Sequence, residues 1–143
     1  MILAILNRIS STVGWLTPAR RENMASTWRD KLQIKIPSLS APVSQLSGGN
    51  AQRVVLTKWL ATDPKLLILD SPTVGVDIGN KQGIYEIVRS LTERGVAVLM
   101  ISDEVPEVYF NCDRVLHMRD GELVHSFVPG DQSETQIMET VYA

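Results

Sequence analysis

Hydrophobic residues change their spacing along the chain, and after about residue 46 helix-like and strand-like spacings alternate. A helix is expected from about Gly49 to Ala61, and the apolar run "KLLIL" that follows has the length and composition of a buried strand. A second amphipathic helix comes next, with an apolar face formed by Ile84, Ile87, Val88 and Leu91. The run "VAVLMI" then reads as another strand. This strand, helix, strand order predicts a parallel sheet.

The segment before residue 46 has a different pattern, without alternating strands. Residues 17–33 are expected to form a helix, because Thr17 can cap it, Pro18 suits its first position, and Met24, Trp28 and Leu32 recur on one face. Residues 1–45 are therefore expected to be mostly helix and loop. The tryptophans at positions 15, 28 and 59 are expected to pack this helical part.

Past residue 113 the pattern indicates a hairpin and a short helix. Two alternating strands surround Asp120-Gly121, a dipeptide that favours a tight two-residue turn. His117 and His125 fall on these strands, so we interpret them as surface or packing residues. Ser133 and Gln136 have the spacing of a capping box for a last helix.

Composition narrows the classes of function. The 143 residues suit one domain, and 14 Lys and Arg against 16 Asp and Glu leave no basic excess to attract nucleic acid or an anionic membrane. Cys112 is the sole cysteine, which excludes a disulfide framework within the chain and favours a reducing cytoplasm. The longest apolar run after the N-terminus, residues 96–101, is far below the ~20 residues of a membrane helix. The chain is expected to be soluble, or peripheral to a membrane through a partner.

Chemistry is concentrated in the stretch "LSGGNAQRVVLTKWLA". Ser47, Gly48 and Gly49 come immediately before the expected helix, where free backbone amides and the helix dipole favour a phosphate. Taken alone, this tripeptide is more typical of a flexible turn capped by serine. The residues that follow favour a phosphate-binding loop over a simple turn. After this tripeptide come "LLILD", Pro72-Thr73 and "VGVD", in the order of an ATP-binding-cassette (ABC) ATPase.

The chain resembles the ABC ATPases in four motifs. Residues 46–52 resemble the signature motif, 66–70 the Walker B strand and 74–77 the D-loop, while "VLMISDEVPEV" occupies the place of the switch strand. With Asn50 where most families have glutamine, the pattern is similar to the second ATPase half of bacterial importers of simple sugars such as ribose or galactose. The resemblance implies an α/β fold, the C-terminal portion of a P-loop NTPase (ABC ATPase). Residues 1–45 would be part of the helical subdomain, and 46–143 the signature helix and C-terminal part of the RecA-like core.

Three departures from the family fall on one composite site. The chain has no GxxxxGK[ST] Walker A loop, so Met1 is expected to be an internal start or the edge of a fragment. Ser71 stands where the family has its catalytic glutamate, and a serine hydroxyl cannot act as a general base near neutral pH. Asp103 stands where the family has a histidine that contacts the γ-phosphate, and a carboxylate there repels a triphosphate. No catalytic residue is therefore expected to be intact.

The resemblance nevertheless implies roles for other residues. It assigns nucleotide binding to Ser47, Gly48, Gly49, Asn50, Gln52 and Asp77, and a magnesium ligand to Asp70. The expected cofactors, ATP and Mg²⁺, would be present only in the complete assembly. The expected partners are a second ATPase half and the membrane permease subunits of an importer, with no nucleic acid. This would place the chain in the cytoplasm, at the inner face of the cell membrane.

Three hypotheses follow for the function. The favoured one is a non-hydrolysing half of a tandem ATPase that lends its signature loop to ATP held by a partner half. A second is an active enzyme from which this chain is cut, with a Walker A loop upstream. A third is a decayed gene product or an interaction module without nucleotide function.

Overall fold

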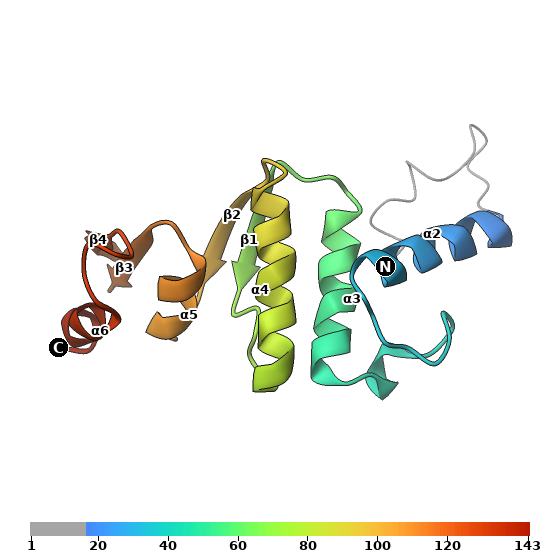
Figure 1. The fold of residues 1–143 in the computed structure, drawn as a ribbon, viewed down its shortest axis with the longest axis horizontal. Helices are drawn as coiled ribbons and strands as arrows, with labels where there is room; N and C mark the ends of the chain where they lie inside the picture. The colour runs from blue at the N-terminus through green and yellow to red at the C-terminus, as the bar shows by residue number, and fades with distance from the viewer. Residues whose placement is uncertain (1–16) are drawn as a thin grey trace. The chain divides into compact units, whose positions relative to one another are not determined.

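The computed structural model of the protein describes residues 17–143, which form two compact units (Figure 1). Of these residues, the first unit holds 17–67 and Thr73–Ala97, and the second holds Ile68–Pro72 and Val98–Ala143. The chain passes from one unit to the other within strands β1 (Leu66–Asp70) and β2 (Ala97–Ile101). The mixed α/β character expected from the hydrophobic pattern is confirmed.

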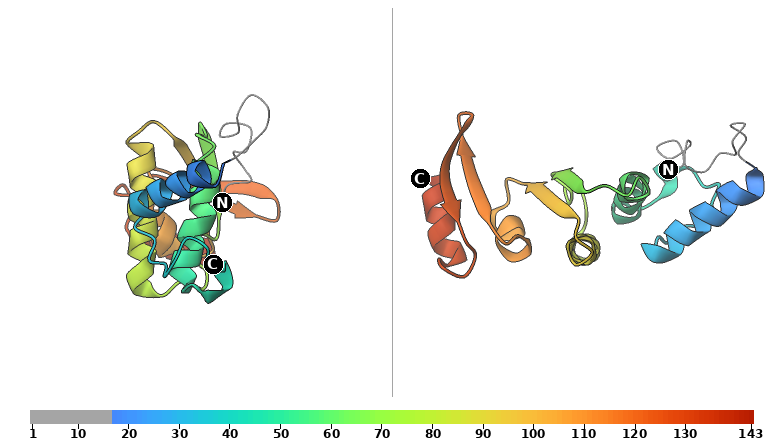
Figure 2. Two further views of the ribbon diagram at one scale, coloured as in Figure 1. Left: turned by 90° about the vertical axis from the view of Figure 1, so that its right-hand side faces the viewer. Right: turned by 90° about the horizontal axis from the view of Figure 1, so that it is seen from above.

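The helices of the first unit begin where the sequence has capping residues. Thr17 caps α2, its hydroxyl oxygen accepting a hydrogen bond from the Arg20 amide, and proline occupies the first turn as predicted. The helices α3 and α4 run side by side in Figure 1 and Figure 2, and the buried face of α4 consists of Ile84, Val88 and Leu91. The helical elements of this unit are α2 (Pro18–Lys31), the short 3₁₀ turn η2 (Val43–Gln45), α3 (Gly48–Leu60) and α4 (Ile78–Thr92).

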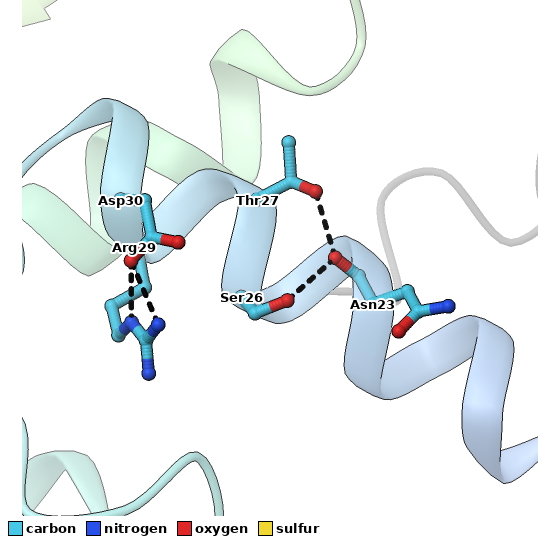
Figure 3. Close-up of polar contacts among 5 residues, drawn as sticks. All are labelled: Asn23, Ser26, Thr27, Arg29 and Asp30. Carbon is cyan, nitrogen blue, oxygen red and sulfur yellow. Dashed lines mark hydrogen bonds and ion pairs between the residues drawn. The ribbon is translucent and has the colours of Figure 1, made fainter.

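Helix α2 is held by local polar contacts more than by burial. The hydroxyls of Ser26 and Thr27 both donate to the Asn23 carbonyl oxygen, at 2.9 and 2.8 Å, and Arg29 pairs with Asp30 (Figure 3). None of the helix's residues is buried. Contacts of this exposed kind add little stability each.

The prediction that the tryptophans pack the helical part is wrong for Trp59. Trp59 is 49% exposed, and Trp28 and Met24 on α2 are only half-buried. Leu32, which directly follows α2, is buried. Trp15 lies outside the described residues. The spacing of Met24, Trp28 and Leu32 correctly identified a helix face, which is buried at Leu32 and half-buried at the other two residues.

Strands β1 and β2 pair in parallel, as the strand, helix, strand order predicted. At one end the Ala97 amide donates to the Lys65 carbonyl, and at the other the Ser71 amide donates to the Ile101 carbonyl. In the part of the chain that the structure describes, this sheet has two strands. One face of β1 is buried through Leu67 and Leu69. The sheet also carries apolar side chains that are about half exposed, namely Leu66, Ile68, Leu99 and Ile101.

The second unit contains α5 (Val105–Asn111), β3 (Val115–Arg119), β4 (Glu122–Phe127) and α6 (Glu134–Tyr142). The strands form an antiparallel hairpin in which Val115 faces Phe127, with an irregularity after His117. A small core joins the hairpin to both helices, and α6 lies beside the hairpin in Figure 2. This core consists of Val105, Val115, Phe127 and Ile137.

Local signals in this unit are confirmed. Asp120 and Gly121 both have positive φ, 51° and 84°, as a two-residue hairpin turn requires. The Ser133 hydroxyl and the Gln136 side chain form the reciprocal capping box at the start of α6. Across residues 17–143, each helix is too short or too polar to cross a lipid bilayer.

Candidate functional site

Ser47 and the two glycines after it form the start of α3. Ser47 is the N-cap, with extended backbone at φ −62° and ψ 155°, and its side chain does not cap the helix. The first backbone hydrogen bond of the helix runs from the Ala51 amide to the Ser47 carbonyl, so the amides of Gly48, Gly49 and Asn50 lack partners within the helix. Ser47 and Gly48 are exposed. The loop therefore presents N–H donors at the positive end of a helix of 13 residues.

The segment 74–80, which includes the expected D-loop, lies directly against this helix start. A methyl group added at Gly48 would come within 2.8 Å of the Gly75 carbonyl oxygen, so the two backbones leave no room for a side chain. One added at Gly49 would come within 2.6 Å of the Asn80 Cβ. The glycines thus allow close packing of the signature loop on the segment 74–80, and a second function, open access to an anion, is compatible with the exposure of Gly48.

Asp77 caps the start of α4 and is tied to Asn80. Asp77 is the N-cap residue, and its Oδ1 accepts a hydrogen bond of 2.7 Å from the Asn80 side-chain nitrogen. The Asn80 amide also donates to the Asp77 carbonyl at 2.9 Å. Asp77 is exposed, and its carboxylate has a local structural role at the start of α4.

Asn50 and Gln52 differ in how they are engaged. The Asn50 side chain accepts from the Lys35 amide at 2.8 Å and donates to the Ser47 hydroxyl at 2.9 Å. Gln52 is half-buried on α3. Both residues were expected to bind nucleotide, and the structure places Asn50 beside Ser47 with its amide already used within the chain.

The end of β1 holds Asp70 and Ser71, both in the second unit. Asp70 is exposed and its Oδ1 accepts a hydrogen bond of 3.2 Å from the Ser71 hydroxyl. Ser71 has a positive φ of 48°, an uncommon conformation for a residue with a side chain. Its amide bond to the Ile101 carbonyl, 2.9 Å long, holds the backbone there.

Asp103 lies at the same edge of the sheet, two residues past the end of β2. The Ser102 hydroxyl before it donates to buried Glu107 and accepts from the Glu104 amide. The Asp103 carbonyl oxygen accepts from the Tyr142 hydroxyl at 3.0 Å, which connects this loop to α6. Because β1 and β2 are parallel and paired, the structure brings Asp103 to the sheet edge where Ser71 also lies.

Two residues important to this geometry were not predicted from the sequence. Asn80 packs on Gly49, and Arg53 packs on Gly83 while donating to the Leu32 and Gln33 carbonyl oxygens, both at 3.1 Å. The available signal was the glycine in each helix, since a glycine inside a helix often marks close approach of a neighbour.

The chemistry of these residues fits a polyphosphate better than a free metal ion. The start of α3 supplies a hydroxyl and backbone amides, which suit phosphate oxygens. No group of three or more His, Cys, Asp or Glu side chains that could hold a metal exists among residues 17–143. Asp70 alone can contribute one carboxylate to Mg²⁺, which ordinarily keeps several waters and substrate phosphates as further ligands.

Comparison with known proteins agrees with this geometry. The sequence model described as "ABC transporter" matches residues 7–74, a range that includes the signature and Walker B motifs. A ribose import ATP-binding protein of Rhodococcus jostii is 45% identical over 137 residues, 94% of this chain and 27% of that protein. A xylose import ATP-binding protein of Geobacillus kaustophilus is 47% identical over 108 residues, 76% of this chain and 21% of that protein. The chain thus spans about a quarter of the length of such relatives.

Solved structures support the fold. A post-hydrolysis state of an ATP-binding cassette bound to ADP and phosphate has a TM-score of 0.69, with 23% identity over 80% of this chain and 49% of that chain. An inward-facing metal-chelate type ABC transporter has a TM-score of 0.76, with 15% identity over 99% of this chain and 56% of that chain. The fold is therefore that of part of a P-loop ATPase cassette. The chain belongs to the ABC transporter ATPase family, and its relatives there are sugar-import ATP-binding proteins.

Proposed function

We propose that this chain lends its signature loop to ATP held by the Walker A loop of a partner ATPase half. The observation that carries the proposal is the start of α3, where Ser47 and Gly48 are exposed beside residues 74–77 and the first amides of the helix lack partners within it. Such a loop needs a triphosphate presented by another chain or half, because this sequence contains no Walker A loop of its own. Asp77, exposed at the start of α4, would reach the same partner.

The proposal includes the absence of hydrolysis at the local site. Asp70 would hold Mg²⁺ there in the complete assembly, but the neighbouring Ser71 has no carboxylate to orient water. Asp103, at the same sheet edge, would repel the γ-phosphate. The site would then bind nucleotide weakly or not at all, and its contribution would be to the closure of the pair.

The proposed physiological role is the import of a simple sugar. The relatives named above support it, since their names are ribose and xylose import ATP-binding proteins. In this proposal residues 1–45 form part of the helical subdomain, and residues 46–143 form the signature helix and the C-terminal part of the RecA-like core of the second ATPase half. Membrane permease subunits hold the assembly at the cytoplasmic face. The sugar itself would be selected by those other subunits.

Two substitutions in the complete transporter test the proposal. Ser47→Arg puts a bulky cation where a small hydroxyl should meet phosphate, so ATP turnover and transport should fall by about 10²–10³-fold or more. Asp70→Asn removes a charge that matters only to the idle local site, so the loss should be far smaller. Both variants are compared at equal expression, with steady-state ATPase and sugar uptake as readouts. Loss of turnover in Asp70→Asn with normal turnover in Ser47→Arg would refute the proposal, and normal turnover in both would favour a module without nucleotide function.

A further inference from the structure

Asn50 is the residue by which this signature motif departs from the common pattern, and its side chain bridges two parts of the first unit. Its Oδ1 accepts from the Lys35 amide at 2.8 Å, and its Nδ2 donates to the Ser47 hydroxyl oxygen at 2.9 Å. A backbone amide can only donate, so Lys35 requires the oxygen of the side chain and leaves the nitrogen for Ser47. The hydrogen-bond partners thus fix the orientation of the Asn50 amide.

The donor facing Asn50 is itself held in place. Arg53, one turn further along α3, donates to the Leu32 and Gln33 carbonyl oxygens at 3.1 Å each. Residues 32–35 are consequently attached to α3 at both of these side chains. The Lys35 amide therefore belongs to a segment with a defined position against the helix, which makes it a reliable anchor for Asn50.

The direction of the hydrogen bond between Asn50 and Ser47 determines whether the Ser47 hydroxyl can donate to another group. An N-cap serine commonly uses its oxygen to accept from a backbone amide of the first turn, but Ser47 makes no such bond. Its oxygen accepts from Asn50 instead, so the hydroxyl hydrogen is still available to donate. Accepting one bond also polarises the hydroxyl and strengthens it as a donor. A donor of this kind, beside the open amides of α3, complements an anionic oxygen.

We propose that Asn50 is a positioning residue that orients the Ser47 hydroxyl as a phosphate donor and does not itself contact the nucleotide. The inference rests on the proposed function and deepens it, because it explains how Asn50 acts on ATP turnover through Ser47. A glutamine at this position has one more methylene group, about 1.5 Å of reach. A glutamine amide would have to fold back by that length to reach both partners, so the shorter asparagine matches the spacing between Lys35 and Ser47.

A double-mutant cycle in the complete transporter tests the inference. Ser47→Ala, Asn50→Ala and the double variant are compared by kcat and KM for ATP. Ser47→Ala should lower kcat/KM by about 10²-fold or more, as for loss of one donor to the transition state. Asn50→Ala should lower it by about tenfold, because Ser47 keeps its hydroxyl but loses its orientation. The double variant should match Ser47→Ala alone, since Asn50 then has nothing to orient.

The outcomes separate this inference from the proposed function. Normal turnover in Ser47→Ala refutes the proposed function. A large loss in Ser47→Ala, combined with a double variant whose loss is the product of the two single losses, refutes only the positioning role and indicates direct contact by Asn50. Normal turnover in Asn50→Ala also refutes the positioning role. Thermal melts of all three variants accompany the kinetics. If Asn50 had a purely structural role, Asn50→Ala would lower Tm by the same amount in the wild-type chain and in the Ser47→Ala variant.

Discussion

His117 is a buried titratable group within the hairpin of the second unit. It is 9% exposed, and its Nδ1 has no hydrogen-bond partner among the described residues. His125 faces it across the strands, with stacked rings whose centroids are 5.6 Å apart. Desolvation, together with the nearby charges of Arg119 and His125, lowers the pKa of His117 below its usual value. The folded hairpin therefore favours the neutral imidazole.

This preference predicts that mild acid destabilises the protein. An unfolded histidine titrates near pH 6.5, and a lower folded pKa means that the unfolded state binds the proton more tightly. Stability contributed by neutral His117 is then present above about pH 6.5, is lost as the pH falls through that value, and stops changing below the folded pKa. Tm measured between pH 7.5 and 5.5 should decrease with acid, and His117→Gln should flatten the slope.

A matched variant identifies the responsible ring. His125→Gln should retain most of the slope, because the largest cause of the shift at His117 is its desolvation. The chain has two histidines, and carboxylates titrate mainly below this window, so other groups contribute little. A Tm that rises on acidification, or a slope that follows His125 alone, would contradict the assignment.

At the scale of elements, α3 and α4 are held close by glycines, and a methyl group tests that contact. Gly49→Ala would place Cβ 2.6 Å from Asn80 Cβ, so the helices must shift and the free energy of unfolding should fall by about 1–3 kcal/mol. Gly79→Ala is the control, since its Cβ would lie an ordinary 3.6 Å from Asp77 Oδ2. It should be neutral or stabilising by up to about 1 kcal/mol through helix propensity. Urea unfolding of both variants measures the difference, and equal stability would show that α3 and α4 tolerate separation.

Elements whose signals are local were predictable from the sequence. The Asp120-Gly121 turn and the Ser133 cap depend on residues within four positions of one another, and the structure confirms them. The parallel pairing of β1 and β2 was also predictable, because a short crossover helix leaves few alternatives. The contacts at the site depend instead on residues far apart in sequence. Asn50 meets the Lys35 amide and Gly49 meets Asn80 only after the helices have packed, and no local pattern encodes such pairs.

Periodicity predicted the buried face of α4 but not the exposure of the tryptophans. The spacing of Trp28 and Met24 correctly indicated one helix face, but spacing does not say whether anything covers that face. Trp59 shows the same limit, since an aromatic residue in a helix adjacent to a core remained 49% exposed. Burial depends on which other elements pack against a segment, and the sequence of the segment alone does not specify them.

For the whole molecule, we predict that the 143-residue chain alone binds ATP very weakly and does not hydrolyse it. The signature loop offers a hydroxyl and a few amides, whereas tight binding of a triphosphate also needs the lysine and amides of a Walker A loop. Isothermal titration of the purified chain with ATP and Mg²⁺ should give no measurable heat at micromolar concentrations. Micromolar affinity, or phosphate release above background, would contradict this prediction.

The reactivity of the chain's single cysteine can report local unfolding at the end of α5. Cys112 is the C-cap residue of that helix and is half-buried, and desolvation is the largest cause of the raised pKa of its thiol. Because the thiolate is the reactive form, alkylation at neutral pH should be slow while the helix end is closed. Because Cys112 is half-buried, the labelling rate of the intact protein combines reaction in the folded state with reaction after the end of α5 frays, and a rise in that rate reports more frequent fraying at this one site.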